Sequence, residues 1–200
     1  LYFQFTVNSC PTLEPRTPPL EHRLHQLREL AERYGPERIM WRFDPILFWD
    51  DGRKNNLTGF EKIARIASDA GINRCTFSFT TWYAKVKKRP DIDALRPYDP
   101  SMEERRETVR RLTGMAGPLG ITLYACCMEG FDDLSGVGQG RCIDGPLLSE
   151  LAGERCSHAR DTSQRPACGC TASRDIGGYD QACYHSYLYC YANPCFSCCF

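Results

Sequence analysis

Apolar residues recur along the first 125 positions with two different periods, which predicts alternating strands and helices. A β-strand is predicted where they alternate with polar residues or are β-branched and aromatic. An amphipathic helix is predicted where they recur every three to four residues. The predicted strands are residues 2–7, 38–43, 74–80 and 121–127. Strands that alternate with helices indicate βαβ units, a parallel sheet and hence an α/β fold.

Three helices are predicted between these strands. The first has apolar residues at helical spacing over residues 20–34 and ends at a Gly-Pro pair. The second and third each begin with the residue types of a capping box, in which a hydroxyl and a carboxylate three residues apart satisfy backbone N–H groups. These boxes are Thr58-x-x-Glu61 and Ser101-x-x-Glu104.

The number of these βα units limits the possible architectures of the domain. Four units are half of an eight-unit barrel, which typically takes about 250 residues. We therefore expect residues 1–130 to form half of a (β/α) barrel, a partial barrel of parallel strands that lacks its N-terminal part. The opening LYFQ resembles a protease-tag remnant, but it continues into the strand pattern and is interpreted as native.

The pattern fades after Glu129. Residues 131–200 are predicted to be a loop-rich, cysteine-rich segment packed on the barrel. The run GVGQG is predicted as a loop, and only residues 146–152 have the pattern of a short helix.

One face of the predicted strands is unusually polar. Arg42 and Asp44 alternate with aromatic residues in the second strand, and Thr76 and Ser78 alternate with aromatic residues in the third. The apolar side should face the helices, so the polar side should face the barrel interior or its carboxyl-end mouth. Buried charges must be paired. Arg42 and Asp44 are therefore either a structural ion pair or part of a ligand site.

The amino-acid composition limits the kinds of partner that the protein can bind. Lys and Arg balance Asp and Glu at 25 each, which argues against nucleic-acid binding by bulk electrostatics. The basic run at residues 85–89 leaves nucleic acid open as a substrate, although such runs are usually solvated loops. No apolar run reaches membrane-spanning length and no signal peptide opens the chain, so we expect no membrane partner and a cytoplasmic location.

Cysteine is the compositional outlier. The chain has 13 cysteines, an odd number that fits a disulfide framework poorly. Most of them follow residue 125, and thiolates favour zinc, copper(I) and iron–sulfur clusters. Only Cys195-x-x-Cys198 has the spacing of a zinc knuckle, whereas the tyrosine-rich surroundings suit a shielded cluster. The cysteines therefore predict an iron–sulfur cluster first and zinc second.

Several motifs resemble a known family. Cys183-x3-Tyr187-x-Tyr189-Cys190 is similar to the C-x3-C-x2-C signature of radical S-adenosylmethionine enzymes, with Tyr187 at the position of the middle cysteine. The runs FQFTVN, GPERIMWRFDPIL, GRCIDGPLL, QRPACGCTASRDIGGYD and YCYAN, in that order, resemble the family called domain of unknown function 1848. Members of that family have a C-terminal cysteine cluster similar to the radical S-adenosylmethionine motif. The resemblance implies a barrel-like α/β fold and an iron–sulfur cluster of the 4Fe-4S type, but no established reaction.

The resemblance also implies a ligand set. The implied metal ligands are Cys168 and Cys170, which match the family's C-G-C, together with Cys183 and Cys190. Because Tyr187 replaces an expected cysteine, the set is incomplete relative to the signature. Cys195, Cys198 and Cys199 match no part of the family pattern.

Four hypotheses follow. In the first, three cysteines leave one iron open to S-adenosylmethionine, and Arg42, Asp44 and Glu129 orient the cofactor or substrate. In the second, four cysteines hold a fully ligated cluster for electron transfer or structure. The third is a zinc-stabilised interaction or structural module, and the fourth is a copy whose cluster site has degenerated. The reaction and the small-molecule or macromolecular substrate do not follow from the sequence.

Overall fold

The computed structural model describes residues 1–176, 185 and 187–191. Its centre is a sheet of five parallel strands in the order β1-β2-β5-β6-β7. The predicted α/β fold with a parallel sheet is confirmed, and over the described residues the sheet is open and forms no closed barrel. Its strands are β1 (Phe3–Thr6), β2 (Ile39–Ile46), β5 (Arg74–Phe79), β6 (Thr122–Cys126) and β7 (Val137–Gly140).

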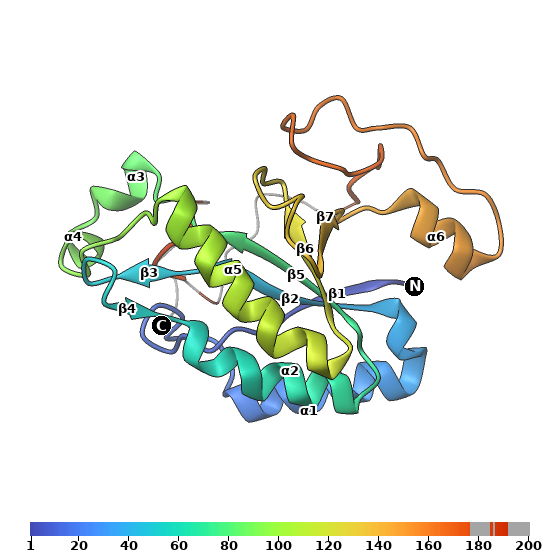
Figure 1. The fold of residues 1–200 in the computed structure, drawn as a ribbon, viewed down its shortest axis with the longest axis horizontal. Coiled ribbons are helices and arrows are strands. Elements are labelled where there is room, and N and C mark those ends of the chain that lie inside the picture. Colours follow the sequence, from blue (N-terminus) through green and yellow to red (C-terminus); the bar gives the residue numbers. More distant parts are fainter. Residues whose placement is uncertain (177–184, 186, 192–200) are drawn as a thin grey trace.

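Three long helices cover one face of the sheet (Figure 1). They are α1 (Leu20–Tyr34), α2 (Phe60–Asp69) and α5 (Met102–Ala116), close to their predicted bounds. The remaining elements are the strands β3 (Phe48–Trp49) and β4 (Lys54–Asn55), the helices α3 (Ala84–Lys87), α4 (Pro90–Asp93) and α6 (Gly145–Ala152), and the 3-10 turns η1 (Pro36–Arg38), η2 (Leu57–Gly59) and η3 (Gly117–Leu119).

One predicted capping box is confirmed and the other is wrong. At the start of α5, the Glu104 N–H donates to Ser101 Oγ at 3.3 Å, and the Ser101 N–H donates to the Glu104 carboxylate at 2.7 Å. Thr58 makes no such cap, because residues 57–59 form η2 and α2 begins only at Phe60. Side chains three apart in a 3-10 turn align, so this turn brings both Leu57 and Phe60 into the core.

Two strand predictions also need correction. The GVGQG run is not a loop, because it supplies β7, which pairs with β6 through backbone groups that require no particular side chains. Strand β2 does not stop at residue 43, as predicted, but runs to Ile46, with a shift in its pairing to β5 after Phe43.

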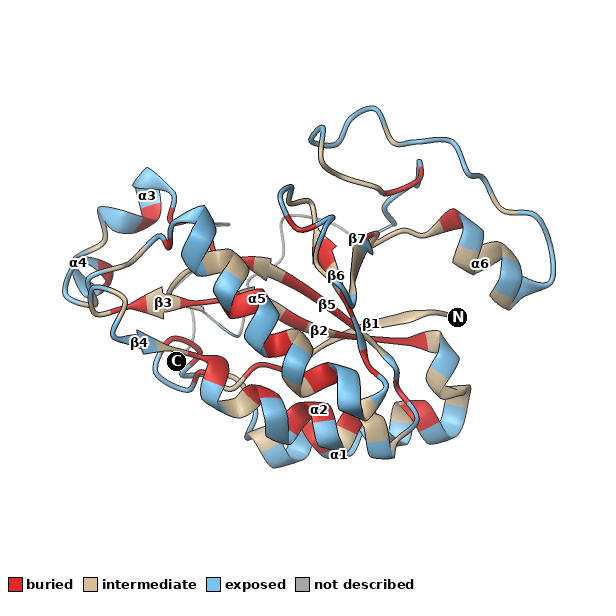
Figure 2. Cartoon of the chain, viewed as in Figure 1, coloured by how far each residue is buried: buried red, intermediate tan, exposed pale blue. Residues whose placement is uncertain are grey.

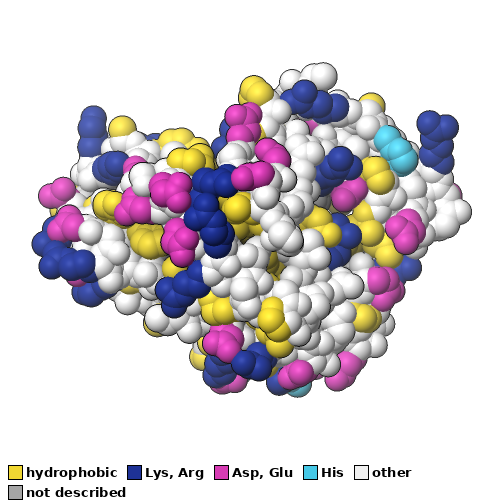
Figure 3. Space-filling model, in the orientation of Figure 1, with side chains coloured by type: hydrophobic (Ala, Val, Ile, Leu, Met, Phe, Trp, Pro, Cys, Tyr) yellow, Lys and Arg dark blue, Asp and Glu magenta, His cyan; other side chains and the backbone are white. Residues whose placement is uncertain are grey.

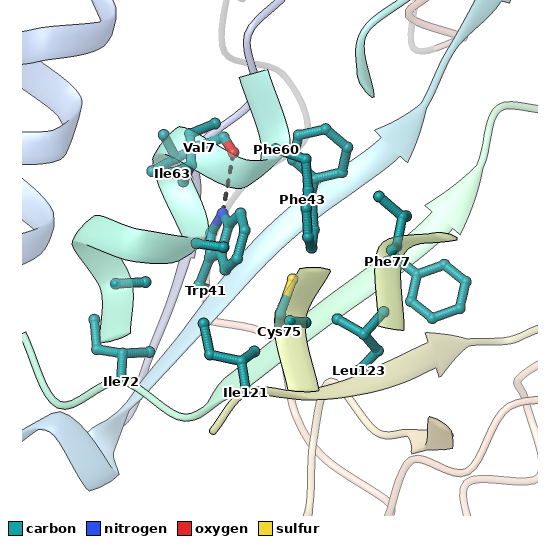
Figure 4. Packing of buried hydrophobic residues seen from close by; sticks show 14 of the residues in the cluster. Val7, Trp41, Phe43, Phe60, Ile63, Ile72, Cys75, Phe77, Ile121 and Leu123 are labelled. Carbon is teal, nitrogen blue, oxygen red and sulfur yellow. Dashed lines mark hydrogen bonds between the residues drawn. The ribbon is translucent and has the colours of Figure 1, made fainter. Parts of the chain in front are cut away.

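A group of aromatic rings packs among aliphatic side chains in the core between the sheet and the helices (Figure 4). The ring centroid of Phe60 lies 5.2 Å from that of Trp41 and 5.0 Å from that of Phe43. The Trp41 indole N–H donates to the Val7 carbonyl at 3.1 Å, so the buried ring nitrogen has its partner. Buried residues run along the strands and the inner sides of the helices, as Figure 2 shows.

A second, smaller core lies near α3 and α4. Its buried residues are Cys10, Leu13, Leu47, Trp49, Trp82, Val86 and Ile92. Leu188 and Tyr189, close to the C-terminus, pack against this cluster. The second core therefore joins the C-terminal segment to the N-terminal part of the chain.

In the described segments, no helix is both long enough and apolar enough to cross a bilayer.

Candidate functional site

A cavity of about 530 Å³ opens at the carboxyl ends of β2, β5 and β6. Ligands of parallel α/β sheets bind at this edge, where the loops that follow the strands converge. Three kinds of side chain that can do chemistry line it: carboxylates, guanidinium groups and thiols. They are Asp44, Glu129, Arg105, Arg165, Cys126, Cys127 and Cys190, with Ser78, Thr80, Tyr83, Tyr187, Tyr189 and Tyr191 beside them.

Asp44 connects the cavity to the polar face of the sheet. Strand alternation places Arg42 and Asp44 on the face opposite the helices. The Asp44 carboxylate accepts hydrogen bonds from Arg42 and from the hydroxyl of Ser78 on the neighbouring strand. The expected pairing of the two charges is thus present, while Asp44 also lines the cavity.

Arg42 lies behind Asp44 and contacts several groups. Its Nη1 donates to Gln4 Oε1 at 2.7 Å and to Cys142 Sγ at 3.2 Å. Burial alone would lower the pKa of Arg42, but the charge and hydrogen bonds of Asp44 and Cys142 outweigh it and raise the pKa. Arg42 is therefore a fixed positive charge between a carboxylate and a thiol.

Cys126 and Cys142 form a close pair of thiols. Their sulfurs lie 3.5 Å apart, and both residues are half-buried. The hydrogen bond from Cys126 and the positive charge of Arg42 lower the pKa of Cys142 to about 6, although burial acts in the opposite direction. The same hydrogen bond, together with burial, raises the pKa of Cys126. The contact with Arg42 therefore favours ionisation of Cys142 over that of Cys126.

The chain turns sharply at the next residue. Cys127 has a backbone φ of 52°, a left-handed conformation that costs a non-glycine residue about 1 kcal/mol. Successive residues of a regular strand face opposite sides, and this turn allows both Cys126 and Cys127 to line the cavity. Burial is the main cause that raises the pKa of the Cys127 thiol, and the neighbouring Cys168 thiol acts in the same direction.

The C-G-C motif lies against the segment that follows β7. Cys170 Sγ accepts the backbone N–H groups of Cys142 at 3.2 Å and Ile143 at 3.5 Å. Burial raises the pKa of Cys170 to about 11, and its thiol also interacts with that of Cys168. The motif thus places Cys168 and Cys170 beside the thiols at the ends of β6 and β7.

The segment of residues 187–191 forms a further part of the cavity wall. The Leu188 N–H donates to the Leu13 carbonyl at 2.9 Å, and the Tyr189 hydroxyl donates to buried Glu14 at 2.8 Å. Arg89 donates to the Cys190 carbonyl at 3.0 Å. These bonds hold Cys190 at the cavity wall.

The predicted site residues fall into three groups. Asp44, Glu129 and Cys190 line the cavity, whereas Arg42 lies behind it, paired with Asp44. Cys168 and Cys170 are near the cavity through their contacts with Cys127 and Cys142. Cys183, Cys195, Cys198 and Cys199 lie outside the described residues. Within the described part of the chain, no three His, Cys, Asp or Glu side chains form a group able to hold a metal ion.

Two cavity arginines were not predicted. Arg105 comes from the first turns of α5, where its Nε donates to the Pro100 carbonyl at 2.9 Å and its guanidinium lies 5.4 Å from the Phe79 ring centroid. Arg165 comes from the loop before the C-G-C motif, and its charge partly offsets the rise in the pKa of the Cys127 thiol that burial causes. Neither belongs to a predicted strand end, so periodicity offered no signal for them.

Charge is mixed over the surface in the space-filling view. Dark blue Lys and Arg side chains alternate with magenta Asp and Glu side chains across the face shown in Figure 3. This mixture agrees with the formal net charge of zero and gives this face no single-sign field for a polyanion.

Comparison with known proteins places the chain in a family. Among curated proteins, no sequence matches it. A family model with the description "domain of unknown function (DUF1848)" matches residues 1–192, nearly the whole chain. The resemblance seen in separate motifs is therefore confirmed by a match of the family model to residues 1–192. The chain belongs to the DUF1848 family.

Proposed function

We propose that this chain is an iron–sulfur protein in which the cluster lies beside the cavity at the carboxyl end of the sheet. The observation that carries the proposal is the position of its cysteines. The C-G-C motif with Cys168 and Cys170 and the later Cys190 come from two separate parts of the C-terminal segment, and both parts lie at this one edge of the sheet. We further propose that the open parallel sheet is part of a (β/α) barrel, whose active sites lie at this edge.

The chemistry of the donors fits such a cluster. Thiolates are the usual ligands of iron–sulfur clusters, and tyrosines and phenylalanines line the cavity beside the thiols. In the proposed site Cys168, Cys170 and Cys190 hold the cluster together with Cys183. When bound, such a cluster supplies single electrons.

The cavity itself fits a small polar molecule. Its volume of about 530 Å³ lies within the range of small-molecule sites. Arg105 and Arg165 can bind a carboxylate, and Asp44 and Glu129 can bind an ammonium group. S-adenosylmethionine carries both groups and is therefore the first ligand to test, with Arg42 holding Asp44 in position.

The test is anaerobic reconstitution of the full chain with ferrous iron and sulfide. We expect bound iron and sulfide with visible absorption, and loss of both in Cys168→Ala, Cys170→Ala and Cys190→Ala. Cys156→Ala is the matched control, because this half-buried cysteine lies in the loop after α6 and away from the cavity wall.

Two results would contradict the proposal. One is zinc without iron or sulfide in the anaerobic protein, which would favour a zinc-stabilised module. The other is a cluster that survives all three substitutions. If the cluster forms, cleavage of S-adenosylmethionine on reduction separates a radical-type enzyme from an electron-transfer protein.

A further inference from the structure

Two thiols outside the proposed ligand set lie sulfur to sulfur on the polar face of the sheet. Cys126 ends β6 and is opposite Gly140 of β7, and Cys142 follows Gly140 by two residues. The chain bends at Cys142, just after β7, and the Cys142 thiol lies beside that of Cys126. Their separation of 3.5 Å is about 1.5 Å longer than an S–S bond, so a small side-chain movement can close it.

The surroundings favour reaction at this pair. Arg42 donates to Cys142 Sγ at 3.2 Å, and a guanidinium that keeps its proton stabilises negative charge on that sulfur. Cys126 lines the open cavity and Cys142 is partly exposed, so small solutes can reach the pair. Over the described residues, neither thiol belongs to a group of three ligands that could hold a metal.

We propose that Cys126 and Cys142 are a redox-active dithiol, oxidised to a disulfide by a low-molecular-weight disulfide of the glutathione class. The Cys142 thiolate attacks one sulfur of the oxidant, forms a mixed disulfide and releases one thiol. The Cys126 thiol then attacks the Cys142 sulfur, forms the intramolecular S–S bond and releases the second thiol. The pair loses two electrons and two protons, and the oxidant gains both. The oxidised pair carries no thiolate, so Arg42 keeps Asp44 as its charged partner.

The pair lies outside the proposed ligand set and contacts it through the bond from the Cys142 backbone N–H to Cys170 Sγ at 3.2 Å. Peptide mapping of the full chain tests the proposal. The anaerobic protein is treated with oxidised glutathione, blocked with a maleimide and digested with trypsin. Cleavage after Arg111, Arg141 and Arg155 puts Cys126 and Cys127 on peptide 112–141 and Cys142 alone on peptide 142–155. We expect these two peptides to be disulfide-linked, and to separate with dithiothreitol.

Matched variants identify the partner of Cys142. Cys127→Ser should keep the link, whereas Cys126→Ser should lose it and accumulate glutathione on peptide 142–155 about tenfold above the unsubstituted chain, because the resolving thiol is gone. Circular dichroism checks that both variants remain folded.

Three outcomes would overturn the proposal. The first is a link that survives in Cys126→Ser but disappears in Cys127→Ser. The second is a link from Cys142 to the peptide that carries Cys168 and Cys170. The third is protection of Cys126 and Cys142 until a chelator is added, which would make them metal ligands.

Discussion

Replacing Tyr189 with Phe removes a hydroxyl that holds residues 187–191 against the body of the protein. That hydroxyl donates to Glu14 at 2.8 Å, and the Glu14 side chain is only 3 % exposed. The other partners of this carboxylate are Asn8 Nδ2 at 3.3 Å and Arg23 Nη1 at 3.9 Å. Both are at the long end of their contact ranges, so neither compensates fully for the lost hydroxyl.

The magnitude follows from the charge on the acceptor. A hydrogen bond to a charged group contributes roughly 1.5–3 kcal/mol, and we take about 2 kcal/mol for this one. If the segment opens locally, this loss raises the equilibrium constant for opening about 30-fold. The substitution should alter the free energy of local opening of this segment, because the Phe ring retains the packing of Tyr189 against the second core.

Amide hydrogen exchange, measured by NMR, reports this opening directly. The Leu188 amide donates to the Leu13 carbonyl at 2.9 Å and should exchange about 30-fold faster in Tyr189→Phe. Tyr191→Phe is the matched control, since Tyr191 is 60 % exposed and its ring keeps the contact with Tyr83 at 5.5 Å. The reasoning fails if Tyr189→Phe changes the exchange rate less than twofold, or if both variants accelerate it equally.

Three further predictions concern the fold around the site. Hydrogen bonds from Arg106 lower the pKa of Asp133 to about 2. The ionised carboxylate therefore stabilises the folded state at pH values above the ordinary pKa of Asp, and this stabilisation is lost as the pH falls through about 2. Arg106→Gln should return that pKa towards 3.8 in an NMR titration, and an unchanged pKa would refute the assignment. Gly140→Ala would place a Cβ 2.7 Å from the Ala125 carbonyl oxygen. We therefore expect urea unfolding to show a free energy of unfolding lower by about 1–3 kcal/mol, together with a weaker Cys126–Cys142 cross-link. Unchanged stability would contradict this close packing. Trp41→Phe leaves the buried Val7 carbonyl without its indole donor, and we expect a loss of about 1–3 kcal/mol in urea unfolding, whereas a neutral substitution would show that the bond contributes little.

The sequence predicted the elements whose side chains carry a period. Helices α1, α2 and α5 have apolar residues at helical spacing, and β2 and β5 alternate, so burial against a common core determines both pattern and structure. Strand β7 has the sequence VGQG, in which glycine removes the alternation. Its pairing with β6 depends on backbone groups that leave no trace in side-chain pattern.

The candidate site was predictable where it follows from strand ends or, for Cys190, from the family motif. Asp44 lies near the end of β2 and Glu129 shortly after β6, and both line the cavity as their positions suggested. Arg105, by contrast, reaches the cavity from a helix. The Cys126–Cys142 contact depends on β7, so the spacing of cysteines along the chain could not indicate it.

The most direct test of the central claim is the iron and sulfide content of the anaerobically reconstituted chain, compared with that of Cys168→Ala and Cys190→Ala. The account predicts iron and sulfide in stoichiometric amounts in the unsubstituted chain and in Cys156→Ala, and their loss in the other two variants. Absence of iron and sulfide from the unsubstituted chain, or their full retention in Cys168→Ala and Cys190→Ala, would contradict it.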